Sequence, residues 1–145
     1  MHEKRLTQRL TGYWERLRKE EAMPPFAKFN PSALDDAWDS CMLIAVNDSA
    51  QPPSYAYYRM GEKVRRLYGG DVAGQSMRPS AKTSQSAKIV KRVDELMTSR
   101  QPVYDDGQFV GPSNKIVKFR SCMLPFGHDN HVTHIIVGLS WREFG

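Results

Sequence analysis

The chain contains only two cysteines, Cys41 and Cys122, and each lies inside an apolar run. Two such residues do not make a disulfide framework, so we expect both to be small core side chains in a reducing compartment. No apolar run approaches the roughly 20 residues that a membrane-spanning helix needs. Residues 1–5 are mostly charged and lack the apolar core of a signal peptide. We therefore expect a cytoplasmic protein with no membrane segment.

Sequence motifs of common enzymes are also missing. There is no phosphate-binding loop with its lysine, and no dinucleotide-binding glycine pattern after a strand. The stretch 69–74 is rich in glycine, but the lysine and hydroxyl residue of a phosphate loop do not follow it, so we interpret it as backbone turns. The absence of a catalytic constellation predicts a protein that is not an enzyme.

The histidines are the best candidates for metal ligands. His128, His131 and His134 lie close together in sequence, with Asp129 between them. Zinc needs three or four such donors in a tetrahedral array. However, His128 and Asp129 fall in a predicted hairpin turn, and His134 lies on a strand whose neighbouring residues are apolar. We therefore expect structural or solvent-exposed roles for these side chains and no metal.

Composition and charge indicate a single globular domain with one basic segment. The 145 residues are 40% hydrophobic and 26% charged, which is ordinary for a folded soluble domain. The net charge is +5, and basic residues outnumber acidic ones between residues 57 and 92. Such an excess can attract an anionic ligand, an acidic partner or nucleic acid, although a solvated helix face explains it as well. The candidate anion-binding residues are Arg59, Arg65, Arg66 and Arg78.

An amphipathic helix is predicted over residues 6–17. Its apolar residues recur at helical spacing and form one stripe, which nothing else in that segment can cover. The stripe must therefore dock on a sheet or on a second copy of the chain. We favour the second copy and keep docking within one chain as the alternative. The predicted dimer interface consists of Leu6, Leu10, Tyr13, Trp14 and Leu17.

Five strands and one long helix are predicted in the rest of the chain. The apolar run 41–46 reads as a strand buried on both faces, and 54–60 pairs back to it. A long amphipathic helix covers 84–99. Three strands follow at 103–110, 114–124 and 132–141, the first interrupted at residues 105–107. This order predicts an α+β fold, an antiparallel sheet with helices on one face.

A small pocket is predicted beside the stretch 57–75. There an aromatic strand breaks at Gly61, a short helix follows, and glycines bend the chain over a sheet face. A core with no cavity would explain the same pattern, since Met and aromatic side chains usually just pack. The side chains predicted to face the pocket are Tyr58, Met77, Val90, Val93, Phe119 and Met123.

Several short motifs resemble those of a known family. They are Trp14 with Leu17-Arg18, Pro24-Pro25, Asn30-Pro31, Tyr58-Arg59-Met60-Gly61, Leu67-Tyr68-Gly69 and Asp71-Val72-Ala73-Gly74-Gln75, followed by three closing strands. Over residues 10–143 the chain resembles a PAS domain, of the bacterial group of short, single-domain PAS proteins with a leading Trp-containing helix. The resemblance implies a five-stranded antiparallel sheet with a pocket under its helices. On this basis we divide the chain into an N-terminal helix, 1–24, and a PAS-like domain, 25–145.

The resemblance also implies a role in sensing or protein contact rather than turnover. Haem-binding PAS domains generally ligate iron from the long helix, and 84–99 contains no histidine. Photoactive flavin-binding members use an Asn-Cys-Arg motif, which is absent. We expect neither cofactor. The favoured function is a regulatory homodimer that contacts a protein partner in bacterial signal transduction. The alternative is a sensor of an anionic small molecule such as a nucleotide messenger, and nucleic-acid binding is the weakest hypothesis.

Overall fold

The computed structural model describes residues 2–49, 52–68, 70, 73–77, 84–111 and 113–144. The helical elements are α1 (His2–Arg18), η1 (Phe26–Lys28), η2 (Pro31–Ser40), α2 (Glu62–Leu67) and α4 (Ser84–Ser99). The strands are β1 (Cys41–Asn47), β2 (Ser54–Met60), β3 (Val103–Val110), β4 (Ile116–His128) and β5 (His131–Phe144). Within the described ranges, no helix is long and apolar enough to cross a membrane.

The strands form one antiparallel sheet in the order β2-β1-β5-β4-β3. This confirms the predicted five-stranded sheet and α+β class. β1 lies between β2 and β5, and its residues from Cys41 to Ile44 are at most 1% exposed, so the apolar run is covered on both faces as predicted. The predicted helix 84–99 coincides with α4.

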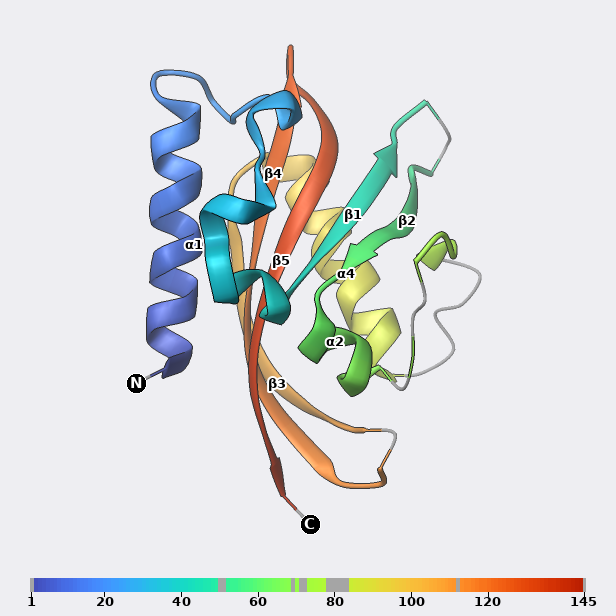
Figure 1. The fold of residues 1–145 in the computed structure, drawn as a ribbon. Coiled ribbons are helices and arrows are strands. Elements are labelled where there is room, and N and C mark those ends of the chain that lie inside the picture. The colour runs from blue at the N-terminus through green and yellow to red at the C-terminus, as the bar shows by residue number, and fades with distance from the viewer. Residues whose placement is uncertain are drawn as a thin grey trace.

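Helices cover both faces of the sheet (Figure 1). α2 and α4 lie on one side, and α1 lies against the other with η2 beside it. Successive side chains of β4 point alternately to these two faces of the sheet. Phe119, Ser121 and Met123 face the side of α4, whereas Cys122 lies on the side of α1, where it approaches Leu10 across Gly138.

The apolar stripe of α1 is buried within the single chain. Leu6, Leu10, Tyr13 and Trp14 are between 1% and 8% exposed and belong to the main core, and Leu17 is half-buried against it. The indole Nε1 of Trp14 donates a hydrogen bond to the carbonyl oxygen of Pro125 in β4 at 2.7 Å. The expectation that these five side chains lie free for a second copy is therefore corrected, because the sheet already covers them. Self-association remains a prediction from the sequence.

The predicted interruption of the strand 103–110 is wrong. β3 is continuous, and Asp105, Asp106 and Gly107 are each in register with a residue of β4. The side chain of Asp105 forms an ion pair with Arg92 on α4, which compensates for a carboxylate inside the strand. The turn between β4 and β5 is at Asp129–Asn130, where both residues have positive φ, as in the turns that suit two-residue hairpins.

Candidate functional site

A small cavity lies between the sheet and α4. Its floor is made by β1, β4 and β5, and α4 and β3 supply the walls. The free volume between the described residues is about 20 Å³, enough for about one water molecule. The lining is mostly apolar and comprises Met42, Tyr68, Ile89, Arg92, Asp105, Phe109, Phe119, Ser121, Met123, Val137 and Leu139.

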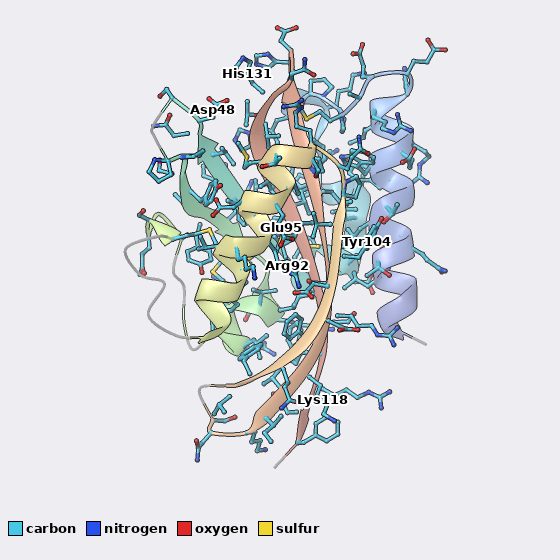
Figure 2. The ribbon with its side chains drawn as sticks, turned by 180° about the vertical axis from the view of Figure 1, so that it is seen from behind. Asp48, Arg92, Glu95, Tyr104, Lys118 and His131 are labelled. Atoms are coloured by element: carbon cyan, nitrogen blue, oxygen red, sulfur yellow. The ribbon has the colours of Figure 1, made fainter. Side chains whose placement is uncertain are left out.

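An ion pair lies in the wall of this cavity. The Nε atom of Arg92 is 3.2 Å from Oδ2 of Asp105, whose side chain is 11% exposed. The same guanidinium donates Nη1 to Glu95 at 2.9 Å and Nη2 to Asp105 at 3.4 Å. Figure 2 shows Arg92 and Glu95 together on α4. The hydrogen bonds that Arg92 donates to Glu95 and then to Asp105 raise its pKa, so this side chain stays cationic.

The pairing of Arg92 leaves one polar atom without a hydrogen bond. Its Nε is buried and makes no well-directed hydrogen bond with any residue of the described chain, although Asp105 is close enough for Coulombic attraction. Ser121, the register partner of Asp105 on β4, lines the same cavity and is only 5% exposed. The cavity therefore presents a cation, a carboxylate and a hydroxyl in otherwise apolar surroundings.

Of the six side chains predicted to face the pocket, two line the cavity under α4 and four do not. Phe119 and Met123 line the cavity. Met77, Val90 and Val93 are buried in the core but do not line it. Tyr58 was wrongly predicted to face inward: it is 50% exposed, and its ring lies 5.9 Å from His134 on the face that α1 covers. The reason is the alternation of side chains along β2: Tyr55 and Tyr57 are its buried residues, so Tyr58 points to the opposite face of the sheet.

The polar members of the cavity were missed by sequence reasoning, although a signal for them exists. On α4, Arg92 follows Ile89 by three residues and so shares its face. On β3, simple alternation from Val103 would have placed Asp105 and Phe109 inward. Reading residues 105–107 as a break in the strand hid this pattern.

The basic segment does not assemble into a site among the described residues. Arg59 is exposed on β2. Arg65 and Arg66 both form ion pairs with Glu62, and the hydrogen bond from Arg65 lowers the pKa of that carboxyl. None of the three lines the cavity or the groove described below. Arg78 lies outside the described residues.

The histidines have separate partners. His131 contacts Asp48 at 2.8 Å, and Figure 2 places both at the same end of the sheet. His128 is 3.4 Å from Asp129. The ring of His134 stacks on Phe26 at 3.6 Å between centroids, and its burial lowers its pKa. Over the described ranges, no three ligand-type side chains come together as a metal site would require.

Both cysteines are free and completely buried. Burial raises the pKa of Cys122 to about 12 and raises that of Cys41 as well. A thiol reacts as its thiolate, so both groups are held in their unreactive form. They are core residues, as the sequence predicted.

A larger groove lies on the surface, where β5 runs past η2. Its volume is about 600 Å³. The walls come from α1, η2 and α2, and the floor from β5. Among the described residues that line it, Arg9, Lys63 and Arg142 are cationic and Asp36 supplies one carboxylate, which Arg9 contacts at 3.2 Å. The other lining residues are Leu6, Ala37, Ser40, Leu139, Ser140 and Trp141.

The comparisons with known proteins agree with this fold. A family model described as a PAS domain matches residues 2–140. The crystal structure of a PAS domain of a protein from Colwellia psychrerythraea superposes with a TM-score of 0.50 at 12% sequence identity, covering 78% of this chain and 95% of that one. No curated protein matches the sequence. Because the family model spans nearly the whole chain, including α1, this protein belongs to the PAS domain family of sensory and regulatory modules.

Proposed function

We propose that this chain is a non-catalytic PAS module of bacterial signal transduction that regulates a partner protein by surface contact. The observation that carries the proposal is the difference in volume between the cavity under α4 and the surface groove at β5. The cavity under α4 is about 20 Å³, whereas the surface groove at β5 is about 600 Å³. Ligand sites usually occupy about 300–1,000 Å³. The surface therefore offers the larger binding volume.

The state of the nucleophilic side chains supports a non-catalytic role. Cys41 and Cys122 are buried and protonated. His134, which could act as a base, is stacked on Phe26 and contacts Thr133 at 2.9 Å. A general base has to reach the proton that it removes. These groups are used for packing instead.

Native mass spectrometry tests the proposal. Purified protein is measured alone and after incubation with a lysate of its host. We expect a complex with one protein at fixed stoichiometry and no small molecule retained on the free chain. A retained small molecule at one equivalent would overturn the proposal in favour of ligand sensing. Reproducible turnover in a broad substrate screen, lost on a point substitution, would overturn its non-catalytic part.

Sensing of a small anion is the second candidate, and the ion pair in the cavity wall favours it. The buried Nε of Arg92 has no well-directed hydrogen bond in the described chain and could donate one to a carboxylate that displaces Asp105. Calorimetry against small carboxylates and nucleotides tests this, with Arg92→Met as the matched variant. Heat that disappears in Arg92→Met would support this candidate, and no heat from any compound would remove it.

A further inference from the structure

The C-terminal part of β5 has a strand on one side only. β5 pairs with β4 as far as Phe144, but its pairing with β1 ends at Gly138. From residue 139 onward, no strand within the described chain lies along the second edge. In Figure 1, β5 continues past η2 toward the C-terminus. The side chains become more exposed along this part of β5: Ser140 and Trp141 are half-buried, and the next three residues are exposed.

The backbone groups that face this open edge follow from the pairing upstream. The carbonyl oxygen of Cys41 accepts a hydrogen bond from the amide of Gly61 at 2.8 Å, so it points away from β5. Its register partner Gly138 must then direct its own N–H and C=O toward β4. Because these directions alternate along a strand, the N–H and C=O groups of Trp141 and Glu143 point to the open edge.

Cationic side chains surround this edge. Trp141 and Arg142 lie in the groove that Lys63 of α2 and Arg9 of α1 border. The charge of Arg9 is paired with the carboxylate of Asp36, and its guanidinium also donates to the carbonyl oxygen of Leu34 at 3.1 Å. Lys63 forms no ion pair with any residue that the structure describes. The carboxylate of Glu143 is turned away, toward Ser113, whose hydroxyl donates to it at 3.3 Å.

We propose that this groove binds an extended acidic segment of a partner protein, which adds to the open edge of β5 as a sixth strand. Its backbone would pair with Trp141 and Glu143, and its carboxylates would meet Lys63 and Arg142. Strand addition takes its affinity from main-chain hydrogen bonds and its specificity from alternate side chains. Charge complementarity selects the acidic segment. This inference rests on the proposed function, because it names the surface through which the module meets its partner.

Fluorescence anisotropy with a short labelled peptide of alternating Glu and Val tests the proposal. We expect saturable binding that weakens as NaCl is raised, since the charges are near the surface. A peptide with Lys in place of Glu should not bind. A peptide with the same charges but Pro in place of Val should not bind either, because proline lacks the N–H that the ladder needs.

Two charge reversals in the groove and one elsewhere complete the test. Lys63→Glu and Arg142→Glu should each weaken binding by about fivefold or more. Lys91→Glu on the exposed face of α4 changes the net charge equally and should leave binding unchanged. In the bound state, amide hydrogen exchange should slow at Trp141 and Glu143. Circular dichroism of each variant verifies that it is folded.

Several results would overturn the inference. They are no binding by the Glu-Val peptide, equal binding by the Pro-containing peptide, or equal loss of affinity in Lys91→Glu. Equal binding of the proline peptide would mean that the groove attracts charge without strand pairing. If Lys63→Glu and Arg142→Glu both retain the partner seen by native mass spectrometry, the inference fails while the proposed function stands. If native mass spectrometry shows no partner at all, the proposed function fails, and the inference that rests on it fails with it.

Discussion

Leu10 of α1 occupies the space that a side chain at position 138 would need. A Cβ atom added to Gly138 would lie 2.1 Å from Cδ1 of Leu10 and 3.2 Å from Sγ of Cys122. The missing side chain on β5 thus allows a helix residue to reach the backbone of the sheet between its two cysteine-bearing neighbours. This contact decides where α1 docks, and it leads to the first prediction.

Gly138→Ala should destabilise the protein. The added methyl group must displace Leu10, and overpacking of a dense core costs about 1–3 kcal/mol. Urea unfolding followed by circular dichroism measures the loss. Gly12→Ala, at a partly exposed position of α1, is the matched control, because its Cβ would meet only the end of the Arg16 side chain at 3.4 Å. That change should raise stability by roughly 0.5–1 kcal/mol.

The origin of the loss can be tested with Leu10→Ala. If the clash with Leu10 is the cause, Gly138→Ala should cost less in that background than in the wild type, which a double-mutant cycle reports. Additive effects of the two substitutions would contradict this explanation.

Trp14→Phe should also destabilise the chain. The change keeps an aromatic ring but removes the donor of the hydrogen bond to Pro125, and an unpaired buried carbonyl costs about 1–3 kcal/mol. Tyr104→Phe is the control, because it removes a hydroxyl that contacts Thr11 at 2.9 Å in an exposed setting. We expect a change within about 0.5 kcal/mol for this control. Equal unfolding midpoints for Trp14→Phe and wild type would show that the bond contributes nothing.

The ion pair between Arg92 and Asp105 should stabilise the docking of α4 on β3. Asp105→Asn is expected to lower the free energy of unfolding by on the order of 2 kcal/mol, as for other hydrogen bonds to charged groups. Glu95→Gln, which weakens a more exposed contact of the same guanidinium, should change it by less than about 1 kcal/mol. A ranking in which Glu95 matters more than Asp105 would refute this prediction.

Stability should fall as the pH is lowered below about 6.5, the ordinary pKa of histidine. Burial against Phe26 lowers the pKa of His134 in the folded chain. In this range the unfolded chain therefore binds more protons than the folded one, so acid favours unfolding. His134→Phe keeps a ring for stacking and should flatten this part of the pH profile of the urea midpoint.

His128→Gln is the control for the pH measurement, since it removes a largely exposed imidazole in the hairpin turn. The slope below pH 6.5 should persist in this variant. If His134→Phe retains the full slope of the wild type, His134 is not the group responsible.

Much of the fold could be predicted from the sequence because its signals are local. The apolar run that became β1 and the helical periodicity of α4 each follow from the spacing of neighbouring residues. The apolar stripe from Leu6 to Leu17 was also visible, and so was the need to bury it. The buried state of both cysteines follows from the runs around them.

Only the tertiary structure decided which segment packs against each of these faces. The stripe of α1 docks on its own sheet because Gly138, more than a hundred residues away, leaves space for Leu10. Tyr57 rather than Tyr58 turns toward the core, and the pairing of Tyr57 with the buried Ile44 of β1 sets this choice. The ion pair between Arg92 and Asp105 forms only when α4 packs on β3. Likewise, only the assembled sheet shows that β5 extends beyond the end of its pairing with β1. Local spacing specifies which face of an element is apolar, whereas what covers that face depends on contacts between segments distant in sequence.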